Sequence, residues 1–156
     1  MRLTICAVGR LRTGPERDLI GDYAERVDRT GRGLGLGPLS FREVEDRKGG
    51  GPAAEAKLLE RALPEAAVIC ALDERGKSLS SPDFAALLAR WRDEGLSDAA
   101  FVIGGADGLD ASLRDRADTR LSFGPMVWPH MLARVMLTEQ LYRAASILAG
   151  LPYHRA

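Results

Sequence analysis

The segment AFVIGGADGLD, residues 100–110, contains a glycine-rich turn of the kind that can hold a ligand. An apolar run precedes Gly104, Gly105 and Gly108, and we expect a helix to follow from about Asp110. Glycines between a strand and a helix let a phosphate approach the backbone amides at the helix N-terminus. Plain tight turns use the same residues, so this turn alone leaves both interpretations open.

A dinucleotide fingerprint is the first specific interpretation of the turn, and the match is poor. The pattern G-x-G-x-x-G is one residue longer than the segment from Gly104 to Gly108, and it belongs after the first strand of a fold rather than a late one. Asp107 would also bring a negative charge toward the phosphates. The residues therefore disfavour a pyrophosphate ligand.

Two other segments point to a cleft at the same place. LDERGK, residues 72–77, leaves a buried strand through a turn about 30 residues earlier, the length of one β-α-β unit. FGPMVWPH, residues 123–130, contains two prolines that stiffen a loop leaving the sheet. Because the carboxyl ends of parallel strands meet at one edge, where α/β folds bind ligands, the three segments together predict a ligand cleft.

Alternating strands and helices must position these segments. Apolar runs predict strands at 3–8, 39–44, 67–72, 101–103 and 121–123. Helical spacing predicts five helices, beginning near residues 15, 52, 82, 110 and 130. We expect Ser81 to cap the third helix and Gly95 to end it. The alternation predicts one α/β domain over residues 1–156, with a mostly parallel sheet and helices on both faces.

Composition and charge narrow the function. The net charge is +0, from 22 basic and 22 acidic residues, a poor electrostatic footprint for capturing free nucleic acid. No apolar run approaches the roughly 18 residues that cross a bilayer, and no signal peptide is apparent, so we expect a cytoplasmic protein with no membrane partner. Cys6 and Cys70 lie in apolar runs, which favours reduced core thiols over a disulfide. With only His130 and His154 besides, no metal site is expected.

Four motifs together resemble a known family. LDERGK, VIGGADG, LSFGPMVWPHMLARVMLTEQLYRA and the terminal PYHR occur in the order and spacing of the RlmH family, the ribosomal RNA large-subunit pseudouridine-N3 methyltransferases of the SPOUT class. The resemblance covers essentially the whole chain. It implies a SPOUT α/β domain with a C-terminal trefoil knot, a homodimer, and S-adenosylmethionine as methyl donor. The implied substrate is N3 of a pseudouridine in 23S rRNA of the assembled ribosome, the 70S particle.

The resemblance also assigns site residues. The implied contacts to the donor are Leu72, Gly104, Gly105, Phe123, Gly124, Pro125, Met126, Val127 and Trp128. N3 of pseudouridine carries a proton at neutral pH, so a general base or nearby cations should help the transfer. The candidates are His154 and Arg155, supported by Arg134 and His130. In this family the tail is thought to reach the donor site of the partner subunit.

Some details and functions stay open. Many relatives have a hydroxyl residue in place of Val127, and some have an acidic residue in place of Ala156. Glu139 and Arg143 could form a structural ion pair or take part in catalysis. The alternatives are a SPOUT methyltransferase acting on tRNA ribose 2′-hydroxyls, a ribosome-binding factor without catalysis, and, more remotely, a nicotinamide-dependent oxidoreductase.

Overall fold

Five parallel strands form one sheet in the order β2-β1-β4-β3-β5. The computed structural model describes residues 1–155, so Ala156 lies outside the described residues. The strands are β1 (Arg2–Val8), β2 (Leu39–Val44), β3 (Val68–Ser78), β4 (Asp98–Ile103) and β5 (Thr119–Ser122). The helices are α1 (Pro15–Gly31), α2 (Gly51–Ala62), α3 (Ser81–Asp93), α4 (Ala111–Arg116) and α5 (His130–Leu148), with a 3₁₀ turn at Arg32–Leu34.

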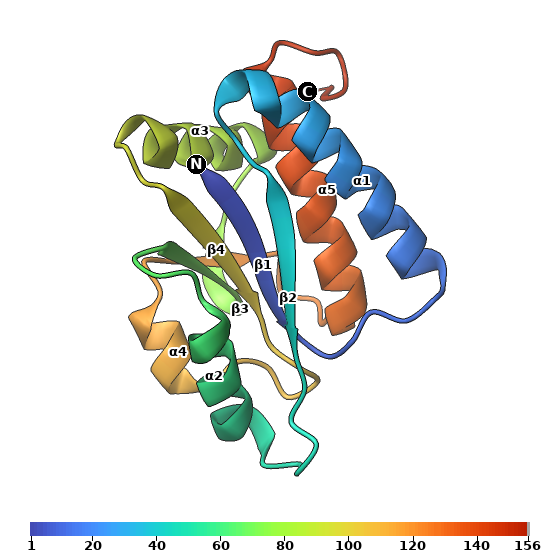
Figure 1. The fold of residues 1–156 in the computed structure, drawn as a ribbon, viewed down its shortest axis with the longest axis vertical. Coiled ribbons are helices and arrows are strands. Elements are labelled where there is room, and N and C mark those ends of the chain that lie inside the picture. The colour runs from blue at the N-terminus through green and yellow to red at the C-terminus, as the bar shows by residue number, and fades with distance from the viewer. Residues whose placement is uncertain (156) are drawn as a thin grey trace.

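Helices cover both faces of the sheet. Figure 1 shows α1, α3 and α5 on one side and α2 and α4 on the other. Side chains alternate along β1, so that Leu3 and Ile5 enter one core whereas Cys6 and Val8 enter the second. Burial on both faces explains why these strands are continuous apolar runs in the sequence. The predicted fold class, a parallel sheet between two helical layers, is confirmed, while the trefoil knot stays a prediction.

The cap of α3 lies one residue earlier than the sequence suggested. The Oγ atom of Ser80, not of Ser81, accepts a hydrogen bond from the Asp83 amide at 3.2 Å. Pro82 fits the first turn of the helix, where its missing N–H has no intrahelical partner to lose. Asp110 caps α4 in the same way, because its carboxylate accepts from the Ser112 amide at 3.0 Å. These caps fix where the strand-end loops stop and the helices begin.

β3 continues through LDERGK, and the predicted end of the strand at residue 72 is wrong. Leu72 and Lys77 both lie opposite Leu121 of β5, so residues 73–76 loop out of the ladder and pairing then resumes. A Cβ on Gly76 would lie 2.6 Å from the carbonyl carbon of Arg120, so only glycine allows the two backbones to approach so closely. The bulge keeps 73–75 at the carboxyl edge of the sheet, where the turn was expected.

The two cysteines are free and buried, as the sequence predicted. Burial raises the pKa of Cys6 to about 11 and that of Cys70 to about 12. Both thiols are therefore protonated near neutral pH, the state in which a thiol packs as a small apolar group. None of the helices within residues 1–155 is long and apolar enough to cross a membrane.

Candidate active site

A cleft of about 530 Å³ opens at the carboxyl edge of the sheet. Its walls come from the β3 bulge, the glycine turn after β4, the loop after β5 and the first turn of α5. The size is that of an ordinary small-molecule site. All the predicted donor contacts except Pro125 line the cleft: Leu72, Gly104, Gly105, Phe123, Gly124, Met126, Val127 and Trp128. The structure thus brings the three strand-end segments together, and their role as donor contacts stays a prediction.

The glycine turn is a tight turn that also forms a wall of the cleft. The Gly108 amide donates to the Gly105 carbonyl at 3.0 Å, and Gly108 has a φ of +79°. A Cβ on Gly104 would lie 2.6 Å from the carbonyl carbon of Gly108. The backbone conformation of the turn therefore requires glycine at positions 104 and 108, whether or not a ligand binds. The structural and the ligand-lining interpretations of the turn are therefore compatible.

The loop after β5 is anchored at its base and exposed at its tip. The Ser122 hydroxyl donates to the Glu74 carbonyl at 3.0 Å and accepts from the Gly124 amide at 3.1 Å. At the tip, the apolar residues Met126 and Val127 are 70% and 86% exposed. Large apolar side chains gathered beside a cleft commonly mark a surface that a ligand or a second protein covers.

Asp73 is a cleft residue that the sequence reasoning missed. Its Oδ1 atom accepts from the Arg75 amide at 3.3 Å, whereas Oδ2 is buried and has no hydrogen-bond partner among residues 1–155. A buried oxygen without a donor is unfavourable, so it marks a place where a ligand N–H or O–H group would fit. The signal in the sequence was an acid directly after a buried strand, in the pair Leu72-Asp73.

His130 and Arg134 lie one helical turn apart at the start of α5, in different surroundings. His130 lines the cleft. Its Nε2 atom lies 3.5 Å from where a Cβ of Gly9 would stand, so β1 ends close against this turn of the helix. Arg134 does not line the cleft, and its side chain is only 1% exposed. The sequence analysis proposed both residues as supporting catalytic groups, but only His130 lines the cleft.

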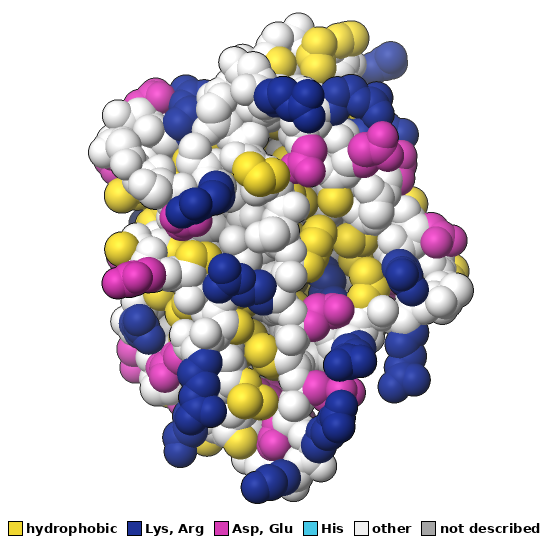
Figure 2. All heavy atoms as spheres, viewed as in Figure 1, with side chains coloured by type: hydrophobic (Ala, Val, Ile, Leu, Met, Phe, Trp, Pro, Cys, Tyr) yellow, Lys and Arg dark blue, Asp and Glu magenta, His cyan; other side chains and the backbone are white. Residues whose placement is uncertain are grey.

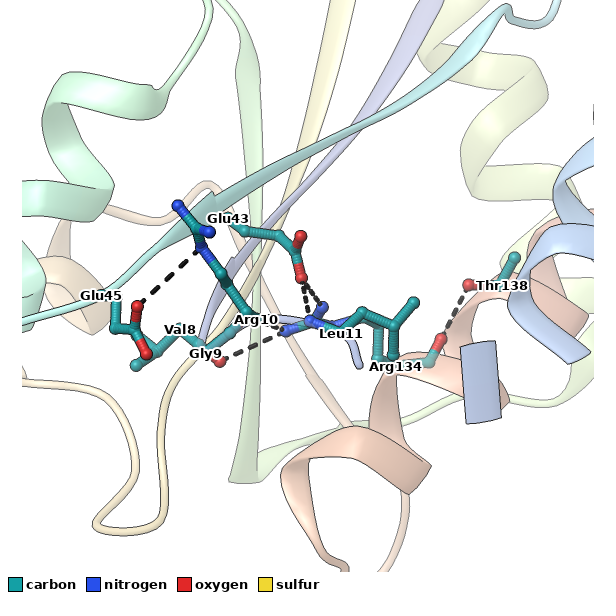
Figure 3. Close-up of polar contacts among 8 residues, drawn as sticks. All are labelled: Val8, Gly9, Arg10, Leu11, Glu43, Glu45, Arg134 and Thr138. Atoms are coloured by element: carbon teal, nitrogen blue, oxygen red, sulfur yellow. Dashed lines mark hydrogen bonds and ion pairs between the residues drawn. The ribbon is translucent and has the colours of Figure 1, made fainter. Parts of the chain in front are cut away.

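The Arg134 guanidinium ties α5 to the ends of two strands. One nitrogen donates to Oε2 of Glu43 at 2.7 Å, and the other donates to the carbonyls of Val8 and Gly9 at 3.2 and 3.0 Å (Figure 3). The Thr138 hydroxyl donates to the Arg134 carbonyl at 2.7 Å. Because β1, β2 and α5 meet at this side chain, Arg134 holds the helix in place beside the cleft.

The C-terminal tail lies along the second half of α5. The Tyr153 hydroxyl donates to Oε1 of Glu139 at 2.9 Å, and Arg143 donates to the same oxygen at 2.5 Å. Arg143 also lies 3.4 Å from Nδ1 of His154 and covers the ring of Tyr153 at 4.8 Å. Burial, with smaller effects of Tyr23 and Glu139, raises the pKa of Tyr153. Glu139 and Arg143 thus form the predicted ion pair, and they hold the tail.

The tail is remote from the cleft of its own chain. Ala133 lines the cleft, and Arg143 follows it by ten residues, which is about 15 Å along a helix. Figure 1 shows α5 beginning near the carboxyl ends of the strands and the C-terminus at the opposite end of the molecule. The structure therefore does not bring His154 or Arg155 to the cleft within one chain.

A second cavity, of about 560 Å³, lies among α1, α3 and α5. Tyr23, Phe84, Val135 and Met136 contribute to its walls. It reaches the base of the β5 loop, since Leu121, Phe123 and Gly124 border both this cavity and the cleft. Among residues 1–155, no group of three or more His, Cys, Asp or Glu side chains could hold a metal ion.

Comparison with known proteins decides the family. The family model described as "Predicted SPOUT methyltransferase" matches residues 1–154. The chain belongs to the SPOUT methyltransferase family. It is 75% identical over 155 residues to a protein of Dinoroseobacter shibae, and 69% identical over 155 residues to one of Ruegeria pomeroyi. Both are named "Ribosomal RNA large subunit methyltransferase H", and each match covers 99% of both chains.

Solved structures of two proteins with little sequence identity to this chain agree in fold. A probable methylase family protein from Haemophilus influenzae Rd KW20 aligns with a TM-score of 0.56 at 14% identity, covering 99% of this chain and 70% of that one. A probable methyltransferase from Bordetella pertussis Tohama I aligns with a TM-score of 0.52 at 14% identity, covering 92% and 96%. At such low identity these two likenesses concern the fold alone.

S-adenosylmethionine is the methyl donor that membership of the SPOUT methyltransferase family entails, as the sequence predicted. The cleft fits that molecule. Its volume of about 530 Å³ suits a nucleoside with an amino-acid tail. Phe123 and Leu72 offer apolar surface, and the unpartnered Oδ2 of Asp73 offers an acceptor for an amino or hydroxyl group.

Proposed function

We propose that the protein methylates N3 of a pseudouridine in 23S rRNA of the assembled ribosome, with S-adenosylmethionine as donor. The observation that carries the proposal is the 75% identity, over 99% of both chains, to a protein named "Ribosomal RNA large subunit methyltransferase H". A cleft with an apolar loop and an unpartnered carboxylate oxygen supports it. The proposal places the reaction in the cytoplasm, where ribosomes work.

The donor site is proposed to consist of the cleft residues and Pro125. The donor supplies a methyl group already activated by a sulfonium. The glycine turn at Gly104 and Gly105 gives a wall without side chains, and Asp73 accepts a hydrogen bond from the donor's amino or hydroxyl groups. The β5 loop, from Phe123 to Trp128, covers the bound donor. Val127 contributes apolar contact only, because it has no hydroxyl.

The tail is proposed to act on the cleft of a second copy. His154 removes the N3 proton, and Arg155 stabilises the negative charge that develops on the base. The separation of about 15 Å along α5 supports this arrangement, because a tail held by Arg143 is out of reach of its own cleft. His130 lies in the cleft wall, and it is proposed to contact the base. Arg134 positions α5.

A homodimer is proposed to form over the cavity between α1, α3 and α5. Leu19 and Leu132 are 46% and 39% exposed beside this region, and α5 carries apolar residues on nearly every side. A second copy that covers these side chains would bury the apolar surface and deliver its tail. Because the chain has no net charge, we attribute the choice of substrate to the shape of the assembled particle rather than to general attraction for RNA.

The test is transfer of labelled methyl to ribosomes from a strain that lacks the gene. Parallel reactions contain 70S ribosomes, free subunits, stripped rRNA or tRNA, and the labelled nucleoside is identified by mass spectrometry after digestion. Label on N3 of pseudouridine, chiefly from 70S particles, is the expected result. Label in tRNA ribose would contradict the proposed substrate. Absence of transfer to every substrate despite intact donor binding would favour a ribosome-binding factor. A His154→Ala variant that transfers methyl as fast as the wild type would contradict the role of His154 as the base.

A further inference from the structure

A separate pocket of about 570 Å³ opens at the carboxyl ends of β1 and β2, against α1 and α5. Three arginines, Arg10, Arg17 and Arg134, line it together with the apolar residues Leu11, Ile20 and Phe41. Figure 2 shows a hollow beside β2 in which yellow apolar side chains surround a recessed dark-blue cation, with further dark-blue side chains at its rim. None of these three arginines lines the donor cleft.

Two arginines of this pocket, Arg10 and Arg17, are largely free to bind an anion. Glu43 is the one acid that residues 1–155 contribute to the wall, and its Oε2 atom is already engaged by Arg134 at 2.7 Å and by the Leu11 amide at 2.5 Å (Figure 3). Arg10 has only a loose, exposed pair with Glu45 at 3.9 Å, a kind of contact that contributes little. Within residues 1–155, Arg17 forms no ion pair.

A buried donor of Arg134, one of the residues that line the pocket, has no acceptor. The Nε atom of Arg134 is shielded from solvent and makes no hydrogen bond within residues 1–155. A guanidinium group satisfies all five of its N–H donors only when enough oxygen atoms surround it. The side chain therefore keeps one N–H donor without an acceptor, while its charge is paired with Glu43.

The pocket and the donor cleft are neighbours along one edge of the sheet. β1, which borders the pocket, pairs with β4, which leads into the glycine turn, and adjacent strands lie about 4.8 Å apart. Arg134 follows the cleft residue His130 by one helical turn, and the end of β1 at Gly9 packs against His130. An extended ligand that enters the cleft with one group can therefore place another group in this pocket.

We propose that this pocket binds a backbone phosphate of the RNA strand that carries the target base, an inference that rests on the proposed function. Arg10 and Arg17 contact the phosphate oxygens from the rim, where a guanidinium fork matches their geometry. Leu11 and Phe41 provide an apolar wall for the adjoining sugar or base. The pocket gives a chain without net charge a local cationic contact next to the chemistry.

The experiment compares Arg17→Gln and the double variant Arg10→Gln/Arg17→Gln with the wild type. The matched control is Arg29→Gln, which removes a cation paired with Glu25 near the other end of α1. Co-sedimentation with 70S ribosomes is measured from 50 to 200 mM KCl, and donor affinity is measured by calorimetry. We expect the slope of log K against log salt to become shallower by about one for the single variant and about two for the double variant. Donor affinity and the control stay at wild-type values.

Two results would overturn the proposal. Slopes within error of the wild type would mean that neither arginine contacts a phosphate. Loss of donor affinity in Arg17→Gln would mean that the pocket belongs to the donor site. Co-sedimentation does not require methyl transfer, so an inactive wild-type protein would refute the proposed function while the slopes still decide the phosphate site.

Discussion

Arg143 lies 3.4 Å from Nδ1 of His154 and donates to Glu139, which also accepts from the Tyr153 hydroxyl. The tail is therefore held by a network built on one face of α5. In the proposed reaction His154 can remove the N3 proton only if this network holds its imidazole in the correct orientation. Glu139 and Arg143 thus become positioning residues, and their removal should affect the chemical step rather than binding.

Glu139→Gln should lower kcat by about 10- to 100-fold, because small misplacements of a catalytic group have effects of that size. Donor affinity should not change, since Glu139 does not line the cleft. Single-turnover methyl transfer and calorimetry measure the two quantities. Glu25→Gln is the control, because it removes an exposed partner of Arg29 at the same i, i+4 spacing. A weaker donor affinity with normal kcat would contradict the positioning role.

Gly104→Ala should reduce donor affinity at least tenfold and destabilise the fold by about 1–3 kcal/mol. The added methyl group would lie 2.6 Å from the Gly108 carbonyl, so the backbone of the turn must move. Gly21→Ala is the matched control, since nothing lies within 4 Å of the added Cβ. In the middle of α1 that change should stabilise by about 0.5–1 kcal/mol. For both variants, calorimetry measures donor affinity and urea denaturation at fixed protein concentration measures stability. Equal effects of Gly104→Ala and Gly21→Ala would refute the prediction.

Glu43→Ala should destabilise the protein by about 3 kcal/mol, because it leaves the buried Arg134 guanidinium without its carboxylate. In Arg134→Met the unpaired carboxylate of Glu43 can turn to water, since that side chain is 32% exposed. A double-mutant cycle with the two changes should give a coupling energy of about 1–3 kcal/mol. Urea denaturation supplies the four values, and additive losses would mean that the pair contributes nothing.

Stability should fall in alkaline solution through the two cysteines. Burial raises the pKa of Cys6 to about 11 and of Cys70 to about 12, whereas an unfolded thiol titrates near about 8.5. Above pH ~8.5 the folded state then binds more protons than the unfolded state. The contribution of the two thiols to the free energy of unfolding is therefore complete below that pH and is lost as pH rises. Each thiol should remove about 1.4 kcal/mol per pH unit between about pH 9 and 11.

Urea denaturation between pH 7.5 and 10.5 tests this loss, with Cys6→Ala/Cys70→Ala as the reference. The double variant retains every other titrating group, so the difference between the two curves belongs to the thiols. Parallel curves would refute the prediction. Native protein should also react slowly with a thiol reagent at pH 8, because both side chains are buried.

Local patterns explain why much of the fold was predictable. β1 and β4 are apolar runs bounded by polar residues, and Asp110 precedes a helical pattern, so each element can be located from its own neighbourhood. The rule that parallel strands end at one edge then places the cleft without further information. The family motifs added the identity of the ligand, which spacing alone left undecided.

Non-local contacts explain what the sequence missed. The Arg134–Glu43 bond joins residues 91 positions apart, so nothing near Arg134 indicated that it would be buried. The return of β3 to its ladder depends on Lys77 lying opposite Leu121, far along the chain. Asp73 becomes a candidate site residue only in the folded structure, where its Oδ2 atom has no hydrogen-bond donor.

The strand order determines when each part of the sheet can form during synthesis of the chain. β1, α1 and β2 can assemble once the first 44 residues have emerged, but the other edge of β1 waits for β4, whose Asp98 pairs with Arg2 across 96 residues. At about 5–20 residues per second, that edge stays open for roughly 5–20 s on each nascent chain. Val102 and its neighbours must then insert between β1 and β3, so the centre of the sheet is completed late. Chaperones that shield open strand edges should therefore engage this small protein while the ribosome is still translating it.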